Sequence, residues 1–198
     1  MMPIHFPFSR TIRNYFEDKA FRRSLIGWCF SENRIVSLLA LSRSGEWRDF
    51  YLPVSVKNKT VLDVGANQGD SAKFFIDNGA SKVIAIECCD KAFQYLAANA
   101  KLHPQIVPIH KRFDLSDLDR EFDFLKVDIE GYEYVLLDRL LSTPAVLEVH
   151  GLPLIERFRN AGYKIKYPSE SCQLGYSCLC YAYWNPMQNF EDKKEMKV

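Results

Sequence analysis

Short apolar segments alternate with helical patterns from residue 60 onward, and this alternation constrains the fold more than any other feature. The apolar segments are TVLDVG, KVIAIE, QIVPIH, FDFLKVD and AVLEVH, and the helical patterns are DSAKFFIDNGA, DKAFQYLAANAKL, YEYVLLDRLL and LPLIERFRNAG. Apolar strands separated by helices build a parallel sheet that is covered on both faces. The sequence therefore predicts an α/β protein with a mostly parallel sheet.

The end of the pattern differs from the rest. Two further strand-like segments, YKIKYP and GYSCLCYAYW, follow one another with no helix between them. Strands joined by about eight residues favour a hairpin, so one of the two is expected to run antiparallel. This brings the predicted sheet to seven strands with an antiparallel hairpin at its C-terminal end. Pro108 in the third segment favours an edge position for that strand.

The first 57 residues have a different character. Helices are expected over roughly 10–24 and 30–42, and the stretch through residue 48 holds eight basic and four acidic residues. We therefore expect an N-terminal helical extension or lid over 1–57, a main domain over 58–186 and a charged tail over 187–198. The extension is either a lid or partner surface, or a helical layer on the sheet with a solvated basic face.

The composition of the chain bears on the cellular compartment and on the binding partners to be expected. The 198 residues carry a formal net charge of +1, so no overall field favours nucleic acid or an anionic membrane. No secretory signal and no membrane span is evident, which predicts a cytoplasmic protein with reduced thiols. The six cysteines are expected to be small buried hydrophobes, with a Cys172–Cys178 bridge or a metal site as alternatives.

The segment VLDVGANQGD, residues 61–70, places a glycine turn between the first strand and the first helix. The nicotinamide fingerprint would need glycine where Asn67 and Asp70 stand, and no Gly-Lys-Ser/Thr follows for a P-loop. Asp63 and Asp70 would also repel a diphosphate, whereas a cationic ligand would be attracted. Asn67 is the non-glycine type that best tolerates the left-handed conformation such a turn needs.

The spacing D-x-G-x-N-x-G resembles motif I of class I S-adenosylmethionine-dependent methyltransferases. The resemblance implies a Rossmann-like fold in which the turn wraps the methionine part of the cofactor, with Asp63 near its ammonium group. Glu87, 24 positions after Asp63, ends the second strand, where an acid accepts hydrogen bonds from ribose hydroxyls. Either Phe113 or Asp114, after the third strand, is expected beside the adenine. The predicted cofactor-binding residues are Asp63, Gly65, Ala66, Asn67, Gly69, Asp70, Glu87, Cys88, Phe113, Asp114 and Asp128.

Three carboxylates gather in FDFLKVDIEGYEYVLL, where the fourth strand meets a helix. Ligands of open parallel sheets bind beyond the carboxyl ends of the strands, so Asp128 is expected near the transferable methyl group. With Lys126, Glu130, Gly131 and Glu133 it resembles the K-x-D-x-E-G-x-E segment of the FkbM family of methyltransferases.

Further matches to that family are the strand ending in Glu148-x-His150 and the later NAGYKI, so the resemblance covers residues 60 to about 184. The family implies O-methylation of a hydroxyl on a small molecule or glycan. Such a reaction needs a base within reach of the acceptor, and Asp128, Glu130 and His150 are the candidates. Each also has a structural alternative: a capping acid, a loop carboxylate or a packed histidine.

Two nearby residues are expected to be structural. Glu133 falls in the first helical turn, where the helix dipole favours an acid. Lys126 lies within the strand pattern and is expected to pair with a neighbouring carboxylate. Asp128 and Glu130 are oxygen ligands suited to Mg²⁺, but no third ligand is evident, so no metal is predicted.

Two other functions fit the same sequence. One is an RNA methyltransferase whose basic N-terminal region holds phosphates, although no Asn-Pro-Pro-Tyr-type segment follows the fourth strand. The other is a methyltransferase-like subunit that binds cofactor or a partner without catalysis. Nucleic acid is the less favoured partner, and neither the methyl acceptor nor the oligomeric state follows from the sequence.

Overall fold

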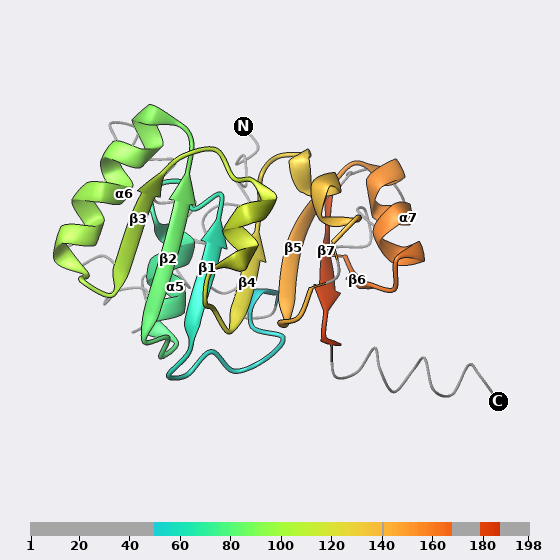
Figure 1. The fold of residues 1–198 in the computed structure, drawn as a ribbon, viewed down its shortest axis with the longest axis horizontal. Helices are drawn as coiled ribbons and strands as arrows, with labels where there is room; N and C mark the ends of the chain where they lie inside the picture. Colours follow the sequence, from blue (N-terminus) through green and yellow to red (C-terminus); the bar gives the residue numbers. More distant parts are fainter. Residues whose placement is uncertain (1–49, 140, 168–178, 187–198) are drawn as a thin grey trace, which may run out of the picture.

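We analysed a computed structural model of the chain, which describes residues 50–139, 141–167 and 179–186. Twelve elements follow one another in these ranges: β1 (Thr60–Val64), α5 (Asp70–Asp77), β2 (Lys82–Glu87), α6 (Asp90–Leu102), β3 (Ile106–His110), the 3-10 helix η1 (Leu115–Asp119), β4 (Phe124–Val127), the 3-10 helix η2 (Tyr132–Leu136), β5 (Ala145–His150), α7 (Leu152–Asn160), β6 (Lys164–Lys166) and β7 (Leu179–Trp184) (Figure 1).

The strands form one seven-stranded sheet in the order β3-β2-β1-β4-β5-β7-β6. The pairs β2–β3, β1–β2, β1–β4 and β4–β5 are parallel, and β7 runs antiparallel to both β5 and β6. Figure 1 shows the arrow of β7 pointing opposite to those of β1 and β2. The predicted α/β class, the antiparallel C-terminal hairpin and the edge position of β3, which contains Pro108, are confirmed.

Alternation along the strands divides the core into two layers. Val61, Phe124 and Val146 point to the face where α5 and α6 pack, through side chains such as Phe75 and Leu96. Their neighbours along each strand point to the opposite face, which η2 and α7 cover; these neighbours are Leu62, Leu125 and Leu147. Because both faces are covered, the central strands are mostly apolar, and the charged residues within them, Asp63, Lys126 and Glu148, are themselves buried.

Two local predictions differ from the structure. Strand β4 begins at Phe124, two residues later than the apolar pattern suggested. The helix expected over residues 132–141 is reduced to the five-residue 3-10 helix η2, which begins after the left-handed Gly131 without a side-chain cap. Because no side chain caps η2, the first backbone N–H groups of this helix need other hydrogen-bond acceptors.

The predicted helices at 10–24 and 30–42 and the tail 187–198 lie outside the described residues. Phe50, Tyr51 and Val56, which precede β1, pack in the core layer on the α5 side of the sheet. No helix in the described ranges combines the length and the apolar character needed to cross a membrane.

Cys180 is buried as predicted, but Cys88 and Cys89 are exposed, because they follow the end of β2 rather than lying within it.

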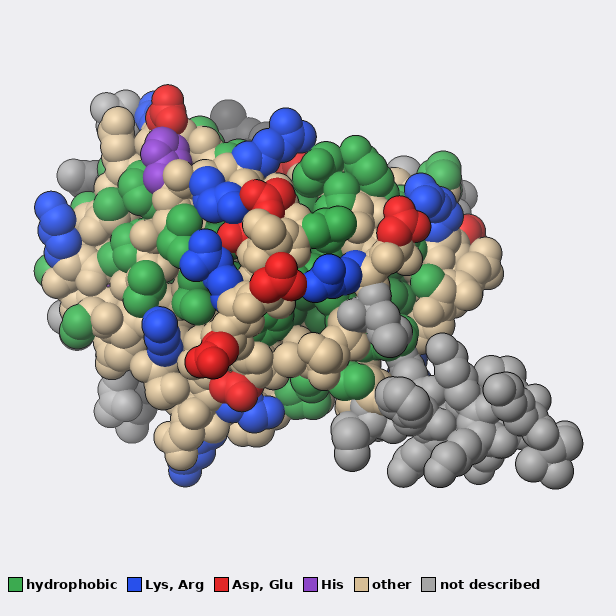
Figure 2. Space-filling view, in the orientation of Figure 1, with side chains coloured by type: hydrophobic (Ala, Val, Ile, Leu, Met, Phe, Trp, Pro, Cys, Tyr) green, Lys and Arg blue, Asp and Glu red, His purple; other side chains and the backbone are tan. Residues whose placement is uncertain are grey.

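Figure 2 shows Lys and Arg side chains interspersed with Asp and Glu over the visible face of the molecule. No broad patch of a single sign is visible on this face, in agreement with the net charge of +1.

Candidate active site

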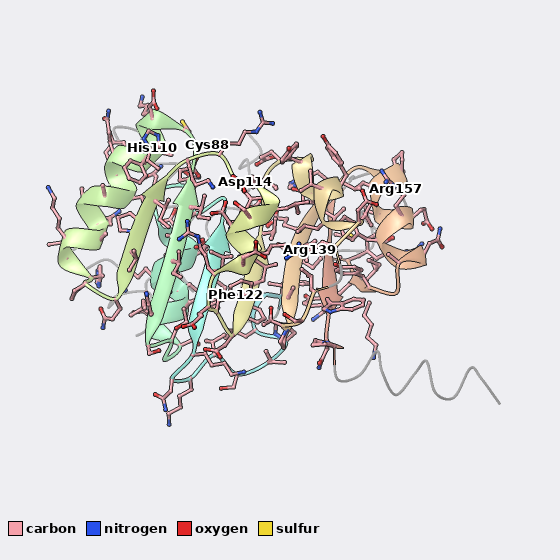
Figure 3. The ribbon with its side chains drawn as sticks, in the orientation of Figure 1. Cys88, His110, Asp114, Phe122, Arg139 and Arg157 are labelled. Atoms are coloured by element: carbon pink, nitrogen blue, oxygen red, sulfur yellow. The ribbon has the colours of Figure 1, made fainter. Side chains whose placement is uncertain are left out.

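The parallel strands β1, β2, β4 and β5 end at the same edge of the sheet, the upper edge in Figure 1. The glycine turn follows β1, Glu87 ends β2, Asp128 follows β4 and His150 ends β5. In Figure 3, Cys88 and His110 lie toward this upper edge, whereas Phe122 lies toward the opposite edge. Residues as far apart in the chain as Gly65 and His150 are thus brought to one edge, where ligands of open α/β sheets bind.

The glycine turn after β1 is held in a conformation that depends on its sequence. Gly65 has φ +73° and Gly69 has φ +94°, and Asn67 is left-handed at φ +50°, as its residue type predicted. A Cβ atom on residue 65 would lie 1.7 Å from the carbonyl oxygen of Asp128. Gly65 is therefore needed for the close approach of the chain after β4, in addition to its positive φ.

Glu87 joins the end of β2 to this turn. Its Oε2 accepts the backbone N–H of Asn67 at 2.8 Å, and its Oε1 accepts the N–H of Cys89 at 2.7 Å. A carboxylate oxygen has more than one acceptor site, so each oxygen keeps the capacity to accept a further donor. Glu87 thus shapes the turn and presents its remaining acceptor capacity at the predicted ribose position.

Asp63 lies beneath the turn rather than on its surface. Its side chain is fully buried, its Oδ1 is 3.1 Å from Lys126 Nζ, and its Oδ2 accepts the hydroxyl of Ser71 at 2.6 Å. The ion pair confirms that Lys126 pairs with a neighbouring carboxylate. Asp63 is therefore enclosed below the turn, between Lys126 and Ser71, and is not at the surface where a ligand would contact it.

The other predicted cofactor residues lie around the turn and after the next strands. Ala66 is buried in the turn, Asp70 is buried at the start of α5, and Cys88 is exposed beyond Glu87. Phe113 is buried in the core layer on the α7 side, whereas Asp114 caps η1 and accepts a hydrogen bond from Lys111 at 2.7 Å. This hydrogen bond and those from Ser116 lower the pKa of Asp114 to about 2.

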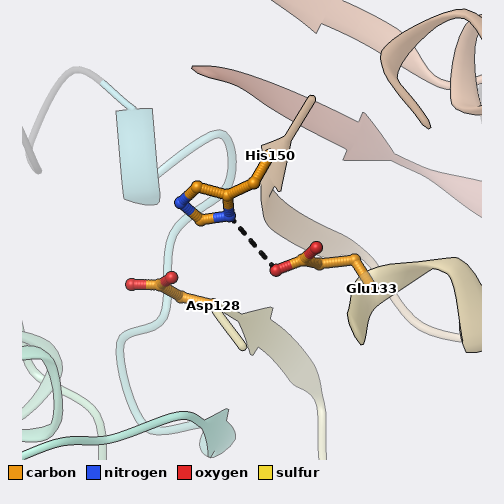
Figure 4. Close-up of side chains that lie close together, drawn as sticks. All are labelled: Asp128, Glu133 and His150. Carbon is orange, nitrogen blue, oxygen red and sulfur yellow. Dashed lines mark hydrogen bonds and ion pairs between the residues drawn. The ribbon is translucent and has the colours of Figure 1, made fainter. Parts of the chain in front are cut away.

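Glu133, which is buried in η2, pairs with the partly buried His150 at the end of β5 (Figure 4). Glu133 is fully buried, and its Oε1 accepts the N–H groups of Ile129 and Gly131, each at 3.1 Å. The same oxygen lies 3.3 Å from Nδ1 of His150. The hydrogen bond to Glu133 raises the pKa of His150 to about 9, so the imidazole is protonated at neutral pH.

Asp128 has the opposite character. Burial raises the pKa of its carboxyl to about 7, and the positive charge of Lys126, whose Nζ lies 4.0 Å from Oδ2, opposes this shift. Its Oδ1 is buried and has no hydrogen-bond partner among the described residues. Asp128 is thus a carboxyl group poised between its two protonation states at neutral pH, with one oxygen free of protein donors in the described structure.

Glu130 is the least enclosed of the three catalytic candidates. Its side chain is 85% exposed, and its Oε2 lies 3.6 Å from Nε2 of His150. Its backbone is left-handed at φ +55°, and Gly131 follows at φ +97°. A non-glycine residue in this region stores strain of about 1 kcal/mol or more. The loop between β4 and η2 is therefore bent sharply so that Glu133 can reach back to its backbone.

Three of these side chains lie close enough together that they could bind one metal ion. Asp128, Glu133 and His150 each offer one possible metal-ligand atom, and the three atoms lie within 4.8 Å of one another. Of the two ligands that the sequence offered, Asp128 belongs to this group of described residues and Glu130 does not; Glu133 and His150 are the other members. However, Glu133 Oε1 already accepts three hydrogen bonds, and a protonated imidazole does not bind a metal. The absence of a metal remains a prediction.

Sequence reasoning missed two contributions to this edge. Tyr51, from the segment before β1, donates its hydroxyl to Glu148 Oε2 at 2.6 Å, and no local motif indicates this contact. Glu133 was predicted to serve only the helix start, yet it is also the partner of His150. The two parts of that pair stand 17 positions apart, and only the adjacency of β4 and β5 could have indicated it.

Among known protein families, no family model matches the chain. A curated relative, histone-arginine methyltransferase CARMER of Anopheles gambiae, is 34% identical over 89 residues, which is 44% of this chain and 14% of the relative. The chain therefore matches only a small part of the length of that protein.

Solved structures resemble a larger share of the chain. The ribosomal protein L11 methylase of Lactobacillus delbrueckii has a TM-score of 0.51 at 22% identity, with 80% of this chain and 81% of that chain covered. Aeropyrum pernix fibrillarin, solved with natively bound S-adenosyl-L-methionine, has a TM-score of 0.51 at 14% identity, covering 74% and 73%. The fold is that of class I methyltransferases.

A third structure fits this assignment. Precorrin-6y C5,15-methyltransferase of Geobacter metallireducens has a TM-score of 0.50 at 16% identity, with 80% of this chain and 94% of that chain covered. The predicted Rossmann-like class I methyltransferase fold is confirmed, and at these identities the comparison establishes the fold alone.

Proposed function

We propose that this protein is an S-adenosylmethionine-dependent methyltransferase of the FkbM type that methylates a hydroxyl group on a small molecule or glycan. The observation that carries the proposal is the position of Asp128, whose carbonyl packs on the glycine turn while its carboxyl faces the edge shared with His150. The predicted cofactor turn and a carboxyl group able to take a proton are therefore adjacent.

The residues of the turn fit S-adenosylmethionine by their chemistry. Asp70 and Glu87 put negative charge around the turn, whereas the charges of Asp63 and Lys126 offset each other in their buried ion pair. This charge suits a ligand that carries a sulfonium and an ammonium group, and it disfavours a diphosphate. Gly65, Ala66, Asn67 and Gly69 would hold the methionine part and Glu87 the ribose. When bound, the cofactor supplies an electrophilic methyl group.

The acceptor hydroxyl must lose its proton as its oxygen gains the methyl group. Among the three candidates, Asp128 is the best proton acceptor, because its pKa of about 7 matches neutral conditions. His150 is protonated at this pH and therefore donates a hydrogen bond rather than accepting a proton. We assign Asp128 as the base, His150 as a cationic donor that orients the acceptor, and Glu130 as an exposed carboxylate at the rim.

A methyl-transfer screen tests this proposal. Full-length protein and S-adenosylmethionine with a labelled methyl group are incubated with glycans, polyketide-like alcohols, RNA and arginine-containing peptides. Base-stable label in an alcohol or glycan is the expected result, and Asp128→Asn should abolish it. Label transferred only to RNA or to arginine would overturn the assignment of the acceptor, and binding of the cofactor without transfer to any class would favour a non-catalytic subunit.

A further inference from the structure

Lys126 is a cation enclosed within the sheet, directly below the candidate site. It lies on β4 with 2% of its side chain exposed, and its Nζ is 3.1 Å from Asp63 Oδ1. The same Nζ donates a hydrogen bond to the carbonyl of Gly65 at 2.9 Å and lies 4.0 Å from Asp128 Oδ2. A buried ammonium is costly unless its charge and its donors are satisfied. Lys126 therefore links β1, the glycine turn and the residue after β4.

The neighbours of Lys126 hold it in place from both sides. Asp63 stands beside Lys126 in the β1–β4 register, and Ser71 at the start of α5 donates to the other oxygen of Asp63. On the opposite side, the ring centroid of Tyr51 lies 5.8 Å from Nζ, and the Tyr51 hydroxyl binds Glu148 of β5. The ammonium thus has little freedom to move away from Gly65 or Asp128.

We propose that Lys126 is a positioning residue for methyl transfer, whose ammonium holds the cofactor turn through the carbonyl of Gly65 and favours the ionised form of the Asp128 carboxyl group. This inference rests on the proposed function, which makes the turn the cofactor site and Asp128 the base. The buried ammonium of Lys126 then fixes the position of the cofactor turn, and it also favours the ionised form of Asp128, the proton acceptor.

The charges around Asp128 explain why Lys126 matters. The groups that face it are Lys126 on β4, Glu148 and His150 on β5, Glu130 in the following loop, and Tyr51 before β1. Burial and the two carboxylates favour the neutral acid, whereas only Lys126 and His150 favour the carboxylate. Because an opposite charge within about 4–6 Å lowers a carboxyl pKa by about one unit or more, loss of Lys126 should raise the pKa of Asp128 further.

A direct test measures Asp128 itself. Carbon-13 NMR of protein with labelled aspartate carboxyl groups follows the Asp128 signal, identified by its loss in Asp128→Asn, as pH is varied. We expect Lys126→Met to raise the titration midpoint of Asp128 by about one pH unit. Where acceptor is available, the acidic limb of kcat should move upward by the same amount, so that turnover falls about 5-fold at pH 7 and recovers above pH 9.

A second variant is needed to separate an effect on Asp128 from a loss of folding, because Lys126→Met leaves Asp63 buried without its counter-ion and can impair folding. Lys126→Met combined with Asp63→Asn removes both charges, and the midpoint of Asp128 should remain raised in this double variant. An unmoved midpoint in the folded double variant overturns the inference. A raised midpoint in the variants, together with a wild-type protein that shows no calorimetric binding of S-adenosylmethionine, overturns the proposed function and leaves the linkage between Lys126 and Asp128 standing.

Discussion

The backbone carbonyl of Asp128 occupies the space that a side chain on Gly65 would need, since a Cβ atom there would lie 1.7 Å from the oxygen. Gly65→Ala must therefore separate the glycine turn from the end of β4, besides straining a residue with φ +73°. We expect the free energy of unfolding to fall by about 3 kcal/mol or more and cofactor binding to be lost. Urea denaturation and calorimetry measure the two effects.

Gly162→Ala is the matched control for this prediction. Gly162 also has positive φ, at +92°, but the nearest atom to a Cβ there is a ring carbon of Trp184 at 4.0 Å. Only the backbone penalty remains, and it should cost about 1 kcal/mol without loss of binding. Equal losses of stability in the two variants would show that contact with Asp128 is not what makes Gly65 necessary.

The glycine turn is the part of the site that could be predicted best from sequence. Its conformation depends on residues adjacent in the chain, and the left-handed Asn67 follows from the local chemistry of its side chain. The contact between Gly65 and Asp128 could not be predicted, because it joins residues 63 positions apart. The sequence motif related this turn only to the cofactor, whereas the structure shows that the backbone after β4 also approaches Gly65 closely.

The pair of His150 and Glu133 predicts how stability depends on pH. The pKa of His150 rises from an ordinary 6.5 to about 9 on folding, so its contribution is full below pH 6.5 and is lost as pH rises through 9. The difference in unfolding free energy between wild type and His150→Gln, measured by urea denaturation, should be about 2 kcal/mol at pH 6 and close to zero at pH 10.

An exposed pair provides the control. His110 Nε2 lies 3.2 Å from Asp90 Oδ1, but the two side chains are 40% and 89% exposed. Exposed pairs contribute little to stability, so His110→Gln should change the unfolding free energy by less than about 0.5 kcal/mol at both pH values. A flat difference curve for His150→Gln would contradict the proposed strength of its hydrogen bond to Glu133.

The same pair predicts the response to chelators. Glu133 Oε1 accepts hydrogen bonds from two backbone N–H groups and from the His150 imidazolium, and Lys126 lies beside Asp128. His150 and Lys126 therefore already supply the positive charge that a metal ion would bring to these two carboxylates. Protein dialysed against EDTA should keep its full methyl-transfer activity and its melting temperature. A loss of activity that Mn²⁺ or Mg²⁺ restores would instead assign Asp128, Glu133 and His150 as metal ligands.

The sequence could not reveal why these carboxylates behave differently. Asp128, Glu130 and Glu133 stand within six residues, yet their side chains are 26%, 85% and 0% exposed. Burial depends on the elements packed against each residue, chiefly β5 and the segment around Tyr51, which lie far away in the chain. The periodicity of the hydrophobic residues predicts the type and order of the helices and strands. The burial and the protonation of the carboxylates in a site depend on contacts between residues far apart in the chain.

Asp128→Asn should reduce turnover far more than cofactor affinity, because the carboxyl acts on the acceptor proton. We expect kcat to fall about 100-fold or more, with less than a threefold change in the dissociation constant for S-adenosylmethionine. Asp119→Asn, an exposed carboxylate paired with Arg139, is the control and should leave both unchanged. If affinity fell and turnover at saturation stayed constant, Asp128 would be a cofactor-binding residue instead of the base.

Cofactor binding is the claim on which the rest of the account depends, and calorimetry of the full-length protein tests it directly. S-Adenosylmethionine and S-adenosylhomocysteine should both bind, and Glu87→Gln should weaken them about 10-fold or more, because a charged acceptor is lost. Asp90→Asn, at the same edge but 89% exposed, should bind like wild type. Binding of NADH with no response to either S-adenosyl compound would contradict the account.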